Sequence, residues 1–168
     1  MRRKISEKVY NFNNNENERG IEKMWTLEKE FNIAIGHRLM KNLNLCQNIH
    51  GHGFRILIGI KAEKLNKDDM VIDFSDVKKM ITPLLDEWDH ATILNENDEK
   101  VLWDLESHSF KIVRVKGDPT SENLCKILYE KINERFEEIK IQNNFYINFE
   151  LDYVTIYETP TSKMTYKG

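Results

Sequence analysis

The most constraining feature of this sequence is a strict alternation of side chains over residues 54–61, FRILIGIK. Every second residue is Phe or Ile, whereas the intervening positions include an arginine, a glycine and a lysine. Successive side chains of a β-strand point to opposite faces, so this period of two predicts a strand with one buried face. Residues 25–35 keep their large apolar side chains on one parity, broken only by Lys29. We expect these two strands to pair antiparallel, with His37 at the end of the inward face of the first strand.

Residues 73–88 repeat their apolar side chains every three or four positions. This period predicts an amphipathic helix that begins with Asp73 or Ser75 as its cap. Pro83 lies inside the pattern, so the helix is expected to begin or kink there.

Three further elements follow along the chain. Residues 110–115 fit a third strand, and the sequence DPT at 118–120 is a good start for a second helix. The last predicted strand covers residues 146–158 and stops at Pro160. The buried stripe of the second helix is predicted to consist of Leu124, Leu128, Ile132 and Phe136.

The resulting order is strand, strand, helix, strand, helix, strand. No glycine-rich phosphate loop interrupts it, so the order favours an α+β fold over a doubly wound sheet. Residues 11–20, NFNNNENERG, are polar. We therefore expect a polar N-terminal extension at 1–22 and a single domain at 23–168.

Charge and composition exclude several classes of partner. The 25 Lys and Arg residues against 28 Asp and Glu residues leave no basic surplus for binding nucleic acid. No apolar run approaches the roughly 20 residues of a membrane span, and the first residues lack the apolar core of a signal peptide. We expect a cytoplasmic protein in which both cysteines are thiols, Cys125 being core filler.

The segment CQNIHGH, residues 46–52, concentrates groups that bind metals. Residues two apart on a strand point the same way, so His50 and His52 can direct both imidazoles at one point. An antiparallel neighbour would bring His37 beside His52. Three neutral histidines with one open position are typical of a catalytic zinc, which supplies Lewis acid chemistry to a bound hydroxyl or carbonyl.

Cys46 has three possible roles: a fourth zinc ligand, a buried apolar side chain, or a thiolate that acts as a base or nucleophile. Its polar surroundings, NLNLCQNIHGH, are unusual for a buried residue. Structural zinc sites usually contain cysteines in pairs. A cation beside a thiol favours the thiolate, which suits general base catalysis.

The dipeptide Asp89–His90 follows the first predicted helix. Such a pair is commonly a solvated helix end. In a catalytic site it has another use, because an aspartate beside a histidine can fix the tautomer of the ring for proton transfer.

Six segments in order along the chain resemble the 6-pyruvoyltetrahydropterin synthase and 6-carboxytetrahydropterin synthase family. They extend from about Met24 to Tyr166 and read FNIAIGH, CxxxHGH, VIDFSDVKK, WDHATILN, PTSEN and VTIYET. The resemblance implies zinc on the three histidines of the cluster, Cys46 as general base, and Asp89 and His90 as a proton relay. It also implies that Glu158 anchors a pterin ring beside Thr120, Ser121 and Glu122.

The family resemblance implies the tunnelling fold, a small antiparallel sheet of four main strands with two helices on one face, in the order ββαβαβ. It implies a homo-oligomer, a trimer or two stacked trimers, with active sites across subunit contacts.

The substrate implied by the family is 7,8-dihydroneopterin triphosphate, a small molecule. The three residues between Cys46 and His50 resemble the branch that forms 6-carboxy-5,6,7,8-tetrahydropterin, acetaldehyde and triphosphate on the route to queuosine. The alternatives are the pyruvoyl branch, which eliminates triphosphate, and a non-catalytic binding protein with a structural zinc and Cys46 as its fourth ligand.

Overall fold

The computed structural model describes residues 24–41, 44–143 and 149–168. The N-terminal extension expected at 1–22 and the start of the strand expected at 146 therefore lie outside the described residues. Within the described parts of the chain, no helix is long and apolar enough to span a membrane.

In the part of the chain that the structure describes, six strands form one sheet in the order β4-β3-β1-β2-β5-β6. The two long central strands were both predicted, and β2 extends beyond the predicted residues 54–61 at each end. Antiparallel pairing joins β1 to β2, β2 to β5 and β5 to β6. The bounds of the strands are β1 Trp25–His37, β2 His50–Ala62, β3 Ala91–Asn95, β4 Ile112–Val115, β5 Phe149–Thr159 and β6 Ser162–Tyr166.

The predicted sheet of four antiparallel strands is therefore wrong in two respects. The sheet is mixed, because β3 pairs parallel with both β1 and β4. It also contains β3 and β6, which the order ββαβαβ omits. Each of these strands has only five residues, too few to show a period against their flanking turns.

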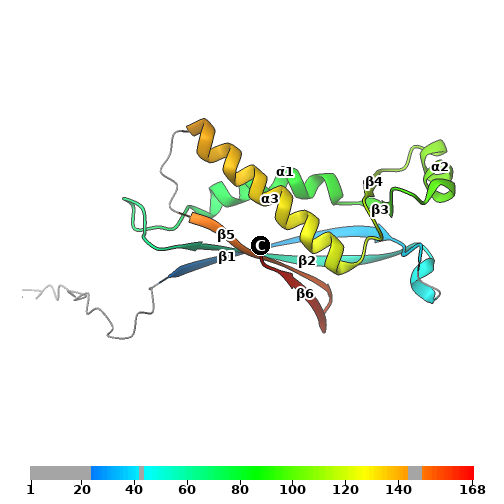
Figure 1. Cartoon of the computed structure of the whole chain (residues 1–168), viewed down its shortest axis with the longest axis horizontal. Coiled ribbons are helices and arrows are strands. Elements are labelled where there is room, and N and C mark those ends of the chain that lie inside the picture. Colours follow the sequence, from blue (N-terminus) through cyan, green and yellow to red (C-terminus); the bar gives the residue numbers. More distant parts are fainter. Residues whose placement is uncertain (1–23, 42–43, 144–148) are drawn as a thin grey trace, which may run out of the picture.

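Two long helices, α1 (Phe74–Trp88) and α3 (Ser121–Asn143), cover one face of the sheet, as Figure 1 shows. Asp73 caps α1 as expected, and its side chain accepts a hydrogen bond from the Ser75 N–H at 2.6 Å. Pro83 lies inside α1 and does not begin it. A third helix, α2 (Glu99–Ser107), was not predicted and lies at the end of the sheet beside β3 and β4. A short 3₁₀ turn, η1 (Leu45–Gln47), precedes β2.

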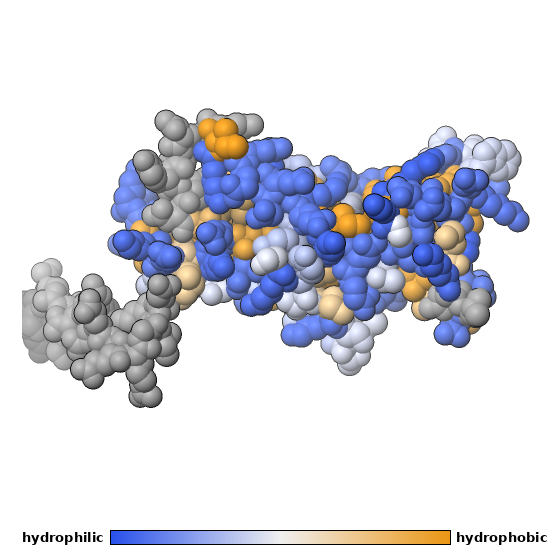
Figure 2. All heavy atoms as spheres, viewed as in Figure 1, coloured by the Kyte–Doolittle hydropathy of each residue, from blue (hydrophilic) through white to orange (hydrophobic). Residues whose placement is uncertain are grey.

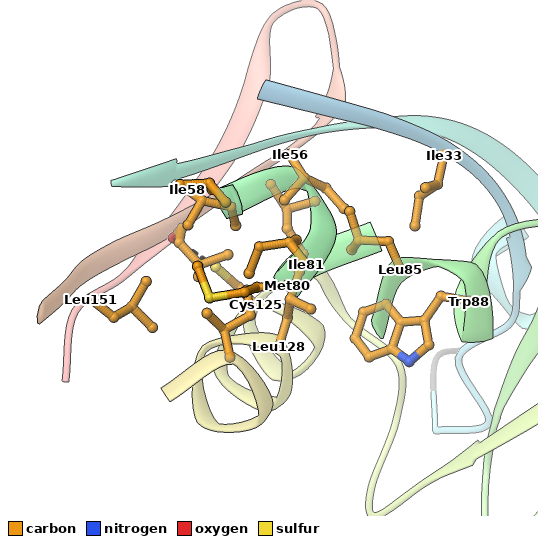
Figure 3. Close-up of a cluster of buried hydrophobic side chains, with 14 of the residues drawn as sticks. Ile33, Ile56, Ile58, Met80, Ile81, Leu85, Trp88, Cys125, Leu128 and Leu151 are labelled. Atoms are coloured by element: carbon orange, nitrogen blue, oxygen red, sulfur yellow. Dashed lines mark hydrogen bonds between the residues drawn. The ribbon is translucent and has the colours of Figure 1, made fainter. Parts of the chain in front are cut away.

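The core lies between the sheet and these two helices (Figure 3). The alternating side chains of β2 are fully buried there, and so is the predicted stripe of α3. By contrast, hydrophilic residues dominate the side of the molecule shown in Figure 2, and hydrophobic residues are visible there as smaller patches between them. The side chains of these two patterns are Phe54, Ile56, Ile58 and Ile60 of β2 and Leu124, Leu128, Ile132 and Phe136 of α3.

The register of the central hairpin positions the histidines. Ile33 lies opposite Phe54, Ile35 opposite His52, and His37 opposite His50. The core side of both strands therefore continues without a break into the histidine cluster.

Candidate metal centre and adjoining cavity

His37, His50 and His52 meet at the end of the β1–β2 hairpin. One ligand nitrogen of each ring lies within 4.8 Å of the others. Zinc binds imidazole nitrogens at about 2.0–2.1 Å, so rings grouped this closely fit one ion after small side-chain adjustments. The predicted convergence of the three histidines is therefore present in the structure.

Backbone carbonyls orient two of these rings. His37 donates from Nδ1 to the Pro119 carbonyl at 2.8 Å, and His50 donates from Nδ1 to the Asn48 carbonyl at 2.8 Å. A carbonyl only accepts, so each Nδ1 carries the proton and each Nε2 keeps its lone pair. Metal-binding histidines are commonly held in this way through the nitrogen that does not bind the metal.

The environment of His37 favours its neutral form. Burial lowers the pKa of this imidazole, and the neighbouring His50 and His52 lower it further, although the Pro119 carbonyl and the Glu158 carboxylate act in the opposite direction. The ring is only 2% exposed, and its Nε2 is buried without a hydrogen-bond partner. Such a nitrogen costs about 1–3 kcal/mol if it stays unsatisfied. A metal ion would satisfy it, so the residues present fit the predicted zinc.

A cavity of about 270 Å³ adjoins the histidines. Cys46, on η1, lines it beside His37 and His50. Cys46 is not part of the group of nitrogens that the three histidines form within 4.8 Å in the described residues. This arrangement disfavours the reading of Cys46 as a fourth ligand and leaves it on the wall of the cavity beside the cluster.

Glu158, near the end of β5, lies at the junction of the cavity and the cluster. Its Oε1 is 3.5 Å from Nε2 of His37 and 3.5 Å from Nε2 of His52. Its Oε2 accepts a hydrogen bond from the Ser121 hydroxyl at 2.6 Å. The carboxylate is thereby oriented by the first turn of α3, where Thr120 and Glu122 also line the cavity.

Asp89 and His90 do not line this cavity. They follow α1, where the Asp89 carboxylate accepts the Ala34 N–H at 2.9 Å and the His90 N–H binds the Ala34 carbonyl at 2.7 Å. The Ala34 N–H lowers the pKa of the Asp89 carboxyl. The carboxylate also lies 3.0 Å from His90 Nδ1, and the His90 side chain is 80% exposed. The structure thus forms the predicted dyad but presents it to solvent.

Sequence reasoning missed the groups that support His37. Asp118 accepts hydrogen bonds from the Asn95 side chain at 2.7 Å and from the Lys41 N–H at 2.9 Å. Burial alone would raise the pKa of Asp118, but these two donors bring it below its ordinary value, so the carboxylate is ionised at neutral pH. Every residue type has a backbone carbonyl, so the sequence does not indicate that those of Pro119 and Asn48 contact histidines. Only the fold shows these contacts.

The sequence is similar to those of known proteins. The sequence profile of a family described as 6-pyruvoyl tetrahydropterin synthase matches residues 26–168. A protein of Aquifex aeolicus named 6-carboxy-5,6,7,8-tetrahydropterin synthase is 31% identical over 162 residues, covering 85% of this chain and 98% of that protein. A protein of the same name from Rickettsia conorii is 35% identical over 134 residues, covering 79% and 92% respectively.

The fold is also similar to a solved structure. The Caenorhabditis elegans 6-pyruvoyl tetrahydropterin synthase superimposes with a TM-score of 0.62 at 24% identity, covering 87% of this chain and 96% of that chain. This likeness concerns the α+β fold.

Proposed function

Because the chain belongs to the 6-pyruvoyl tetrahydropterin synthase family, we propose that it is a 6-carboxy-5,6,7,8-tetrahydropterin synthase. This lyase would convert 7,8-dihydroneopterin triphosphate and water to 6-carboxy-5,6,7,8-tetrahydropterin, acetaldehyde and triphosphate. We place the reaction in the cytoplasm, on the route to queuosine and other deazapurines. The observation that carries the proposal is a cavity that adjoins a histidine triad and is lined by two of its histidines, a thiol and an oriented carboxylate.

The proposed metal is zinc, held by His37, His50 and His52. When bound, it would supply Lewis acid chemistry to the oxygen substituents of the substrate side chain. The support is the donor set of imidazoles and the buried Nε2 of His37 that lacks a hydrogen-bond partner.

Glu158 would bind the pterin ring. A carboxylate matches a planar pair of N–H donors, such as the amino group and ring N–H of a pterin. The Ser121 hydroxyl donates a hydrogen bond to one oxygen of this carboxylate and thereby fixes the plane of the carboxylate. Thr120 and Glu122 line the same part of the cavity and would contact the ring beside it.

Cys46 would act as the general base. It lines the same cavity as the metal ligands His37 and His50 and as Glu158, and there it would accept a proton from the substrate side chain. Asp89 and His90 would relay protons in a site completed by a second copy of the chain, because neither lines the cavity of their own chain. Exposed apolar side chains flank Cys46, with Leu45 85% and Ile49 49% exposed, and such residues are common where subunits meet.

The decisive experiment incubates the zinc-loaded protein with 7,8-dihydroneopterin triphosphate and measures acetaldehyde and the pterin products by mass. We expect acetaldehyde and the carboxypterin in equal amounts. A pyruvoyl product without acetaldehyde would replace the proposal by the pyruvoyl branch, and absence of turnover would favour a binding protein.

Cys46→Ala tests the role of the thiol in the same assay. We expect this variant to keep its zinc and lose turnover by about 10²–10⁴-fold, the usual contribution of a general base. X-ray absorption of the unvaried protein is the control, because a Zn–S shell at about 2.3 Å would make Cys46 a ligand instead.

A further inference from the structure

We propose that Asp118 is a positioning residue for the metal centre: it fixes the Pro119 carbonyl against His37, so that Nε2 of this histidine faces the ion. The inference rests on the proposed zinc site and adds a residue to it. Asp118 lies in the connection between β4 and α3 and contacts no metal ligand with its own side chain in the described structure.

The carboxylate of Asp118 joins two segments on either side of His37. Oδ2 accepts a hydrogen bond of 2.9 Å from the N–H of Lys41, which lies four residues after His37 in the chain. Oδ1 accepts the side-chain amide of Asn95, at the end of β3, at 2.7 Å. β3 pairs in parallel with the end of β1, where Ile93 lies opposite His37. Both hydrogen bonds of the Asp118 carboxylate are therefore made to segments next to the strand end that carries this histidine.

The backbone of Asp118 is held as firmly as its side chain. Its carbonyl accepts the Thr120 N–H at 2.8 Å and the Asn123 side-chain amide at 3.0 Å. The next carbonyl along the chain, that of Pro119, receives the hydrogen bond from His37 Nδ1 at 2.8 Å. Two hydrogen bonds through the backbone and two through the carboxylate thus fix the segment that carries this acceptor, and loss of the two carboxylate contacts would loosen the Pro119 carbonyl against the His37 ring.

The partners of Asp118 explain why the position requires an acid. The Lys41 N–H and the Asn95 amide are both donors, and a carboxylate offers an acceptor to each. An asparagine at 118 would offer one acceptor and one donor. In Asp118→Asn the amide group would therefore face another donor, whichever way the side chain is turned.

The same geometry identifies a compensating change. In the double variant Asn95→Asp/Asp118→Asn, the new amide at 118 can donate to the new carboxylate at 95 and still accept the Lys41 N–H. The new carboxylate also keeps an acceptor for the Asn97 N–H, which binds the Asn95 side chain at 3.0 Å. The exchange restores these hydrogen bonds while the negative charge moves from residue 118 to its hydrogen-bond partner, residue 95.

The test measures the zinc dissociation constant by competition with a chelator, together with the visible absorption of the Co²⁺-substituted protein. We expect Asp118→Asn to weaken zinc binding by about 10–100-fold, the usual loss when a supporting partner of a ligand is removed. The exchanged double variant is expected to recover most of that loss. Its recovery would distinguish positioning of His37 from general destabilisation.

Thr155→Val serves as the control. Thr155 is buried and shares a hydrogen bond of 2.8 Å with Thr165 on the neighbouring strand, so this variant also loses a buried polar contact. We expect its melting temperature to fall and its zinc affinity to stay unchanged.

Two results would overturn the inference: an unchanged zinc affinity in Asp118→Asn, or an exchanged variant that binds zinc no better than the single one. His37→Ala separates these results from failure of the proposed function. If His37→Ala leaves zinc affinity unchanged, the metal site is refuted; if it weakens binding while Asp118→Asn does not, only the role of Asp118 is refuted.

Discussion

The two cysteines of the chain show how strongly the environment decides what one residue type can do. Cys125 is fully buried, and its thiol donates to the Val154 carbonyl at 3.0 Å. Burial raises the pKa of Cys125 to about 11. Cys46 is half-buried on a short turn at the wall of a cavity. The first thiol is a core side chain, as expected from its helical spacing, whereas the second can reach a substrate.

This contrast predicts selective alkylation. At pH 8 the thiolate fraction of Cys125 is about one in a thousand, and the thiolate is the species that reacts. We expect iodoacetamide to modify Cys46 alone in the native protein and both cysteines in denaturant, as measured by intact mass. Native Cys46→Ala should then take up no label. Rapid modification of Cys125 in the folded protein would contradict the buried position described here.

At the scale of the strand, Gly59 of β2 shows why an alternating segment can require a residue without a side chain. The Tyr153 ring of β5 lies against Gly59, and a Cβ at this position would overlap the ring. The requirement is steric, because Gly59 is not among the described residues with positive φ.

Gly59→Ala is therefore expected to destabilise the protein by about 1–3 kcal/mol, the usual cost of overpacking. Urea unfolding followed by circular dichroism measures the change. Gly53→Ala is the matched control on the same strand, because no atom lies within 4 Å of a Cβ at that position. In a Tyr153→Ala background the cost of Gly59→Ala should nearly vanish, and an unchanged cost there would refute the steric explanation.

Most of the elements that the sequence predicted are long enough to repeat their pattern several times, and the strands predicted at 110–115 and 146–158 correspond to β4 and to the described part of β5. Both central strands, α1 and the buried stripe of α3 were found from their repeats, and the histidine triad followed from the strand parity of His50 and His52. The strand β6 was not predicted, because Pro160 ends the apolar pattern of the preceding strand and β6 itself has only five residues. The support of His37 by Pro119 could not be predicted, since a backbone carbonyl 82 positions away leaves no trace in the sequence.

At the scale of the whole molecule, the Asp89–His90 dyad does not line the cavity of its own chain, and this separation leads to a prediction about how the sites are assembled. If the dyad acts in the site of a neighbouring chain, as proposed, two inactive variants should complement each other. We expect Cys46→Ala and His90→Ala to be almost inactive alone. After the two variants are refolded together, random assembly should restore activity to about a quarter of the sites. Acetaldehyde release measures the recovery.

The control refolds each variant by itself, under the same conditions and at the same total concentration. No recovery in the mixture would mean that the thiol and the dyad must come from one chain, which would contradict the proposed intersubunit site. The oligomeric state of the mixed sample, measured by sedimentation, verifies that hybrids have assembled.

The pairing of His37 with His50 at the end of the central hairpin also has a consequence for folding. A β1–β2 hairpin closed one residue out of step would turn the apolar side chains of one strand away from the helices and separate His37 from its partners. Such a chain would lose the core and the proposed metal site together. The proposed zinc would therefore bind only molecules with the correct register, and the zinc content of a refolded sample would measure the fraction of molecules whose strands are correctly aligned.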